Sequence, residues 1–218
     1  STIVLFRVIL TSASSVQLNK EGRIMAKFNT NGNAYTIIYA SVMVIIVAFL
    51  LAFVASALKP TQDANVAIDK KSQILASLNI RGVETANVEA KYAEIVKADP
   101  IYNESAEVEK ENGGFDVANK DIKVENRPLY ICEVEGATKY VVPVKGAGLW
   151  GGISGYIALD DDCQTVFGTY FTHESETAGL GARIVEDWFQ TSFNGKKLFA
   201  EDNSDAVALS VVKKGKEG

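Results

Sequence analysis

Residues 34–58 carry no charged side chain and are mostly apolar, and this run constrains the chain more than any other feature. As a helix of about 25 residues it is about 37 Å long at 1.5 Å per residue, whereas the hydrocarbon core of a bilayer is about 30 Å thick. A core helix of a soluble domain normally has a polar face. Here the main hydroxyls are those of Thr36, Ser41 and Ser56, which can bond back to the helix. We therefore predict a transmembrane helix over residues 34–58.

The two ends of this run indicate that it is an uncleaved anchor. Tyr35 and Tyr39 lie near one end, where an interfacial belt places aromatic residues. Ala55-Ser56-Ala57 has the A-x-A form of a signal-peptide cleavage site, which is the competing interpretation. The apolar run is, however, far longer than the roughly 7 to 15 residues of such signals.

Charged residues flank the run unequally. Three basic residues precede it, Lys20, Arg23 and Lys27. Lys59 alone follows it closely. By the positive-inside rule, residues 1–33 form a cytoplasmic segment and residues 59–218 a domain on the other side of the membrane.

Residues 1–24 form an unusual N-terminal extension. The run from Thr2 to Leu10 is apolar, but Arg7 interrupts it and it is too short to span a bilayer. We expect Met25 to be the natural start, and the residues before it to be either mis-assigned or added for expression.

Composition excludes some classes of partner and site. The chain has 218 residues with 22 basic and 27 acidic side chains and no strongly basic patch, so we expect no nucleic-acid partner. Cys132 and Cys163 lie far apart without a C-x-x-C motif, which excludes a zinc or thioredoxin-like motif. They are either separate thiols or, in an oxidising compartment, one disulfide.

Helical spacing recurs twice after Pro60. Residues 65–77 place apolar side chains on one face and predict a connecting helix. Val88 to Lys97 predicts a second helix, which ends before Asp99-Pro100. Residues 104–111 are acidic and predict a solvated surface segment.

After Arg127 the apolar period changes to two, which is typical of strands. We predict strands over residues 129–135, 140–144, 153–159, 165–172 and 206–212. Turn signals separate the first four: Gly136, Gly146-Ala-Gly148 and Asp160-Asp-Asp162. We interpret the three aspartates as a connector and expect no metal site. The fold class predicted is α+β, with an antiparallel or mixed sheet and flanking helices beyond one transmembrane helix.

The stretch Thr172 to Ala182 joins the fourth strand to a predicted amphipathic helix. The apolar stripe of that helix comprises Ile184, Val185, Trp188 and Phe189. Gly179 and Gly181 lack Cβ atoms and let the backbone approach a flat ligand, while free N–H groups at a helix start favour a negative group. From spacing alone, a plain turn explains the glycine pair equally well.

Trp150, next to Gly151 and Gly152, lies at the mouth of a predicted strand. At this position, the indole of Trp150 either covers the flat ring of a bound ligand or packs in the hydrophobic core of the protein.

Several enzyme motifs are absent. Residues 152–156, Gly-Ile-Ser-Gly-Tyr, do not form a G-x-S-x-G nucleophile elbow. Residues 173–177, His-Glu-Ser-Glu-Thr, do not form the H-E-x-x-H motif of a zincin. The chain has neither a P-loop nor a G-x-G-x-x-G motif, so we expect no direct binding of NADH.

Two motifs resemble a known family. They are Thr172-His-Glu-Ser-Glu-Thr-Ala-Gly-Leu-Gly181 and the run from Tyr140 to Leu159. Both are similar to the periplasmic FMN-binding domain of the C subunit of the sodium-translocating NADH:quinone reductase, and the resemblance covers about residues 25–212. A weaker resemblance is to the G subunit of the Rnf electron-transport complex.

The resemblance implies a single-pass subunit of a respiratory complex in the bacterial inner membrane. Electrons would enter from NADH on other subunits, pass through FMN on the periplasmic side and reach a quinone such as ubiquinone, with sodium expelled. The residues implied in binding FMN are Trp150, Glu176, Thr177, Gly179, Leu180, Gly181 and Ala182. Glu176 and Thr177 would orient the cofactor by hydrogen bonds, and Trp150 and Leu180 would pack on its ring. We expect no catalytic acid or base, and interpret His173 as a loop hydrogen-bonding residue, because electron transfer needs no general base.

In the resembling family, the last threonine of a Ser/Thr-Gly-Ala-Thr segment bears FMN through a phosphoester. No such segment occurs here: residues 135–138 read Glu-Gly-Ala-Thr, lack the hydroxyl residue and precede the glycine stretch. We therefore expect a C-terminally truncated domain and do not assign the attachment to Thr138. Two alternatives stay open, a flavin-free membrane-anchored assembly subunit and an Rnf G-type subunit.

Overall fold

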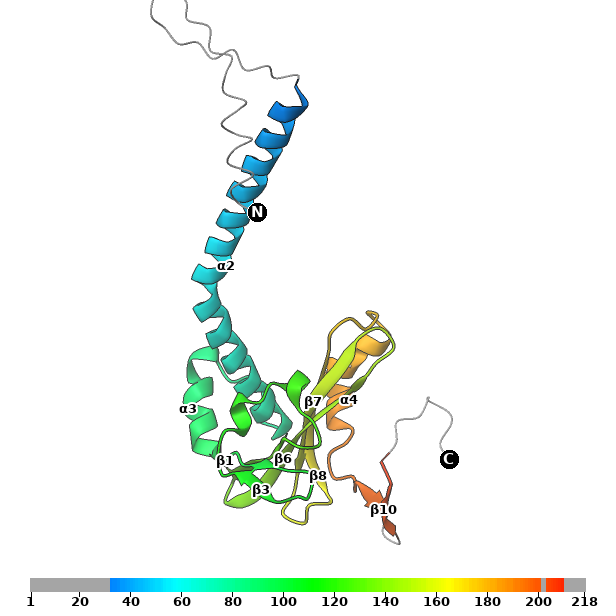
Figure 1. Cartoon of the computed structure of the whole chain (residues 1–218). Helices are drawn as coiled ribbons and strands as arrows, with labels where there is room; N and C mark the ends of the chain where they lie inside the picture. The colour runs from blue at the N-terminus through cyan, green and yellow to red at the C-terminus, as the bar shows by residue number, and fades with distance from the viewer. Residues whose placement is uncertain (1–31, 201–202, 210–218) are drawn as a thin grey trace, which may run out of the picture. The chain divides into compact units, whose positions relative to one another are not determined.

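A computed structural model describes residues 32–200 and 203–209 (Figure 1). The expectations for residues 1–31, including a start at Met25, and for residues 210–218 lie outside the described residues. The chain divides between Thr61 and Gln62 into two units, which are described separately.

Helix α2, Asn33–Ser77, is one continuous helix of 45 residues that includes Pro60. The helices predicted separately over residues 34–58 and 65–77 are therefore one helix. Proline removes one hydrogen bond to the preceding turn, but its fixed φ is compatible with a helix, so the helix can continue through Pro60.

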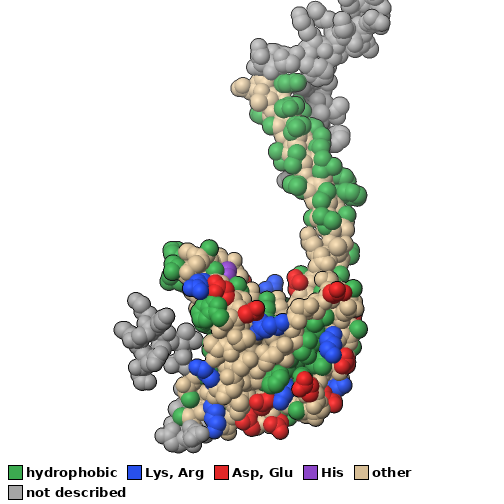
Figure 2. All heavy atoms as spheres, turned by 180° about the vertical axis from the view of Figure 1, so that it is seen from behind, with side chains coloured by type: hydrophobic (Ala, Val, Ile, Leu, Met, Phe, Trp, Pro, Cys, Tyr) green, Lys and Arg blue, Asp and Glu red, His purple; other side chains and the backbone are tan. Residues whose placement is uncertain are grey.

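The part of α2 in the first unit is long and apolar enough to cross a membrane. Its most apolar window of 18 residues has a mean hydropathy of 3.0 and no buried residue. Apolar side chains cover this part of the helix on the visible face (Figure 2). It agrees with the predicted single-pass anchor.

The second unit is built on a five-stranded sheet in the order β1-β5-β6-β7-β8, in which every pair is antiparallel. The strands are β1 Val96–Ala98, β5 Tyr130–Val134, β6 Ala137–Ala147, β7 Gly152–Leu159 and β8 Val166–His173. The four long strands confirm the predicted strands between residues 129 and 172, and the α+β class is confirmed.

The second predicted helix begins and ends earlier in the chain than expected. Helix α3 spans Thr85–Ile95, and Val96 to Ala98 form the edge strand β1 instead of the last helical turn. Val96 pairs with Cys132 of β5, so pairing with the sheet overrides the helical spacing.

Several short elements complete this unit. A small sheet joins β2 Ile101–Tyr102, β3 Val108–Lys110 and β4 Arg127–Pro128, none of which was predicted. The 3-10 helices η1 and η2 span Gly114–Asp116 and Asn119–Asp121. The hairpin β9 Phe199–Ala200 and β10 Asn203–Val207 begins earlier than the strand predicted at residues 206–212, whose last residues are not described. Residues 104–111 are exposed, as predicted.

Turns at opposite ends of β6 set the register. Glu135 and Gly136 have φ values of 53° and 79°, which is typical of a two-residue type I′ turn, and Val134 pairs with Ala137 across it. At the far end, the N–H of Gly148 donates to the carbonyl of Gly151 at 2.8 Å. Gly146 and Ala147, predicted as turn residues, instead continue the ladder.

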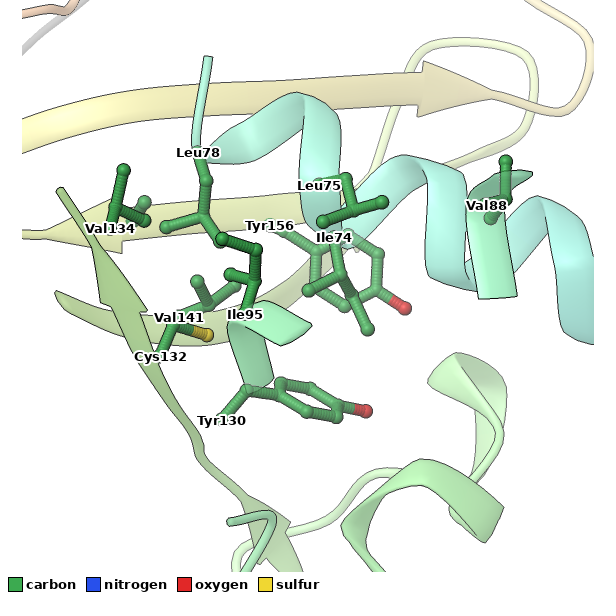
Figure 3. Close-up of a cluster of buried hydrophobic side chains, with 11 residues drawn as sticks. Ile74, Leu75, Leu78, Val88, Ile95, Tyr130, Cys132, Val134, Val141 and Tyr156 are labelled. Atoms are coloured by element: carbon green, nitrogen blue, oxygen red, sulfur yellow. The ribbon is translucent and has the colours of Figure 1, made fainter. Parts of the chain in front are cut away.

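Hydrophobic clusters lie on both faces of the sheet, because successive strand residues point in opposite directions. The larger cluster places Ile74, Leu75 and Leu78 from the end of α2 against Tyr156 and Val141 (Figure 3). Full burial of one such side chain contributes about 1.5–3 kcal/mol. The second cluster joins Leu159 and Val166 to Phe193, which follows the short helix α4, Asp187–Thr191. Helices α2 and α4 therefore cover opposite faces.

Side chains cover the outer edge of β8. The carbonyls of Phe167, Thr169 and Phe171 accept hydrogen bonds from Asn79 at 2.7 Å, Arg81 at 2.9 Å and Gln190 at 3.2 Å, respectively. A sheet edge left unpaired is a template for pairing with other chains, so these three donors close it.

The aspartate run Asp160-Asp-Asp162 is the turn between β7 and β8. Asp162 accepts hydrogen bonds from the N–H of Gln164 and from Thr165, and Asp160 forms an ion pair with Lys139 at 2.6 Å. Within the described ranges, no group of three or more His, Cys, Asp or Glu side chains is placed to hold a metal ion.

The two cysteines are both free thiols in different environments. Cys132 is buried in β5, and burial raises its pKa to about 12, whereas Cys163 is exposed in the β7–β8 turn. Because only the thiolate reacts, we expect a maleimide to label one thiol per native chain at pH 7.5 and two after unfolding, as counted by intact mass. Cys163→Ser should abolish native labelling. Rapid labelling of Cys132 in the native protein would contradict this placement.

Candidate functional site

Two loops meet at one end of the sheet because β7 and β8 are paired there. Ile153 at the start of β7 lies opposite His173 at the end of β8. The loop that enters β7 and the segment that leaves β8 are consequently neighbours. We call residues 148–152 and 174–182 together the glycine shelf.

Three consecutive side chains join the two loops. Glu174 accepts a hydrogen bond from the N–H of Gly152 at 3.3 Å, and Ser175 donates to the carbonyl of Trp150 at 2.7 Å. Glu176 Oε1 accepts from the N–H of Trp150 at 2.9 Å. Hydrogen bonds of a carboxylate are roughly twice as strong as neutral ones, so these bonds fix the loops to each other.

The shelf glycines have two different roles. A Cβ at Gly148 or Gly181 would lie 3.0 Å or 3.2 Å from carbon atoms of the Glu176 side chain, so both residues make room for that side chain. A side chain at Gly181, one of the two glycines predicted to let backbone approach a ligand, would meet Glu176. Gly179 has a φ of +77°, and a Cβ there would meet no atom within 4 Å. Gly179 is therefore the position where backbone is open to a ligand.

His173 is a hydrogen-bonding residue of the loop, as expected. Its Nδ1 accepts the N–H of Glu176 at 3.3 Å. This bond holds the backbone at the point where the segment leaves β8.

The single amphipathic helix predicted after the glycines is wrong. The chain forms the 3-10 helix η3, Gly181–Val185, and then the five-residue helix α4. Glu186 separates them with a ψ of 141°, and its carboxylate binds Arg183 and the indole N–H of Trp188. Helices this short have little macrodipole, so the predicted dipole contribution does not apply.

The backbone donors of the shelf are only partly used. The N–H groups of Leu180 and Ala182, two of the donors expected to be free, both donate to the carbonyl of Thr177 at 3.1 Å. The N–H groups of Thr177, Ala178, Gly179 and Gly181 have no acceptor in the described part of the chain. Several unpaired donors in one short segment suit an anionic or carbonyl oxygen.

Large apolar side chains are exposed next to these donors. Leu149, Trp150 and Leu180 are 82%, 68% and 73% exposed. Trp150 is therefore not a core tryptophan. Apolar side chains gather at this end of the unit, beside the single histidine (Figure 2). Exposed apolar patches of this kind mark binding surfaces.

An apolar hollow of about 260 Å³ lies close to the shelf. It is lined by Ile153, Phe171, Ile184, Phe189, Phe193 and Leu209. None of these side chains offers a hydrogen bond, so the hollow does not suit a phosphate or the polar edge of a ring.

All seven residues predicted to bind the cofactor lie on the shelf. The side chain of Glu176 is bonded to Trp150, and Thr177 acts through its carbonyl. Leu149, Glu174 and Ser175 were missed, although all three adjoin the motifs. Thr138 lies ten residues before Gly148 on β6, about 30 Å along the strand, which agrees with leaving it out of the site.

Comparisons with known proteins find a family match over the part of the chain that contains the shelf. A family model described as "FMN-binding domain" matches residues 148–217. The C subunit of the Na(+)-translocating NADH-quinone reductase of Haemophilus ducreyi is 30% identical over 210 residues, which cover 87% of this chain and 80% of that protein.

Two solved structures have the same fold. The structure of the C subunit of this reductase from Parabacteroides distasonis superposes with a TM-score of 0.67 at 37% identity, covering 74% of this chain and 79% of that one. Shewanella oneidensis NqrC gives a TM-score of 0.59 at 20% identity, covering 70% and 81%, and shows the fold alone. Sequence and structure agree over most of the described residues, so this chain belongs to the family of C subunits of the Na(+)-translocating NADH-quinone reductase.

Proposed function

We propose that this chain carries FMN on the glycine shelf, as the FMN subunit of a sodium-pumping NADH–quinone reductase. The observation that carries the proposal is the set of unpaired N–H groups at Ala178, Gly179 and Gly181 beside exposed Trp150 and Leu180. Donors next to a flat apolar surface fit a planar ring with oxygen atoms at its edge.

The residues of the shelf would bind and orient the cofactor. The unpaired N–H groups donate to its oxygens, and fixed donors favour the negative charge that reduction adds. Trp150 and Leu180 cover the ring and exclude water from it. The carboxylate of Glu176 accepts the N–H of Trp150 and so holds the loop over residues 148–152 in place. When bound, FMN supplies the reversible electron transfer.

The anchor and the partners follow from the same proposal. The apolar part of α2 would span the bacterial inner membrane, with residues 59–218 in the periplasm, as the excess of basic residues before it indicates. Other membrane subunits would receive NADH, pass electrons to and from this FMN, and couple the transfer to sodium export.

Titration of the full-length chain in detergent with FMN tests this function. We expect saturable quenching of FMN fluorescence, because the ring would stack on Trp150. A flavin-free assembly subunit would show no saturable binding, and that result would overturn the proposal. Because residues 1–218 lack a Ser/Thr-Gly-Ala-Thr segment, we expect no fluorescent band from the denatured chain under ultraviolet light.

A further inference from the structure

A buried glutamine connects the glycine shelf to the rest of the domain. Gln190 in α4 is 1% exposed, and its Nε2 donates to the carbonyls of Val185 at 3.1 Å and Phe171 at 3.2 Å. Its Oε1 accepts from Arg81 Nη1 at 3.2 Å. Both N–H bonds and the oxygen of this side-chain amide are thus used, as a buried polar group requires.

The contact with Val185 fixes the 3-10 helix η3, whose first two residues are the last two of the shelf. Val185 is the last residue of η3, the 3-10 helix that begins at Gly181. Near the start of η3, the N–H of Ala182 donates to the carbonyl of Thr177. The segment with the unpaired N–H groups therefore has attachment points on both sides. Before it, Glu176 is bonded to His173 and Trp150, and after it, Gln190 joins Val185 to Phe171 of strand β8.

Arg81 determines which way the amide of Gln190 points. A guanidinium only donates hydrogen bonds, so the atom of Gln190 that faces it must be the oxygen. The amide nitrogen is then directed to Val185 and Phe171. Arg81 is itself held by Asp187 at 3.1 Å and by the carbonyl of Thr169 at 2.9 Å. Arg81 lies four residues beyond the end of α2, so its bond to Gln190 connects that part of the chain to η3.

We infer that Gln190 and Arg81 are positioning residues that hold η3, and with it the unpaired N–H groups of the glycine shelf, in a binding-competent arrangement. The effect of these two residues on FMN binding rests on the proposed function. The order of the shelf, however, can be measured without any flavin.

Hydrogen exchange of the full-length chain in detergent tests the inference. The readout is the exchange rate of the hydrogen-bonded amides of Leu180, Ala182 and Arg183, compared with amides of β5 and β6. Gln190→Met keeps the length of the side chain but removes its donors. We expect at least tenfold faster exchange in the shelf and a much smaller change in β5 and β6.

Two further variants separate positioning from general stability. Gln190→Glu keeps an acceptor for Arg81 but loses both donors, so it should speed shelf exchange as Gln190→Met does. Asn79→Gly removes the donor to Phe167 at the other end of the β8 edge, and glycine tolerates the φ of 61° there. It should leave shelf exchange unchanged.

Unchanged shelf exchange in both Gln190 variants, or equal acceleration over the whole domain, would overturn the inference. Wild-type exchange in Gln190→Glu alone would overturn it too, since the donors would then be dispensable. Selective acceleration in a chain whose wild type binds no FMN would support the positioning role and reject the proposed function.

Discussion

Leu75→Ala is expected to lower the free energy of unfolding of the domain by about 2–5 kcal/mol, the cost of removing a fully buried leucine and leaving a cavity. Leu75 is 0% exposed and lies with Ile74 and Tyr156 in the cluster between α2 and the sheet (Figure 3). Chemical unfolding of the full-length chain in detergent measures the loss. Near-ultraviolet circular dichroism suits this measurement because the rings of Tyr130 and Tyr156, with centroids 6.2 Å apart, lie in the same cluster.

Val66→Ala is the matched control, because Val66 lies on the same helix but is 66% exposed. It removes apolar carbon atoms from α2 without opening a cavity, so its effect should stay within about 0.5 kcal/mol. Equal losses in the two variants would mean that the end of α2 does not pack into the core as described.

The sheet could be predicted from the sequence because its central strands alternate between a buried and a more exposed face. In β5 and β6, buried residues such as Tyr130, Cys132 and Val141 alternate with more exposed ones. A shift of register by one residue would move each buried side chain to the other face, so these strands keep a strong period of two. The two-residue strands β2 and β4 are too short to show such a period, which is why they were not predicted.

The helix predictions failed where a contact with another part of the chain outweighed the helical spacing of apolar residues. Val96 has the spacing of a helix but pairs with Cys132. Glu186 has helical neighbours on both sides but adopts extended backbone, with its carboxylate bonded to Arg183 and Trp188. Partners on a folded surface are not visible in a pattern of apolar residues.

The location of the candidate site could be predicted, but the roles of its residues could not. Gly179 and Gly181 look alike in the sequence, yet a Cβ added at Gly179 would meet open space and one added at Gly181 would meet Glu176. Glu176 looks like a ligand residue but is bonded to Trp150, 26 residues away in the chain. Which N–H groups remain unpaired depends on the turn at Thr177, and only the three-dimensional structure defines that turn.

Gly179→Ala is expected to weaken FMN binding about tenfold or more, which corresponds to about 1.4 kcal/mol. Gly179 has a φ of +77°, and an alanine in this left-handed region costs roughly 1–2 kcal/mol. The backbone can relieve that strain by rotating, which turns the unpaired N–H groups of Gly179 and its neighbours away from a ligand. Fluorescence titration with FMN measures the loss.

Gly136→Ala carries the same backbone strain without touching the shelf. Gly136 has a φ of +79°, lies in the turn between β5 and β6, and like Gly179 has no atom within 4 Å of an added Cβ. Both variants should therefore lose similar stability, and only Gly179→Ala should lose affinity for FMN. If the two variants bound FMN equally well, the backbone at Gly179 would not present donors to the cofactor. If both lost affinity alike, strain anywhere in the domain would explain the effect, and the shelf would have no special part in it.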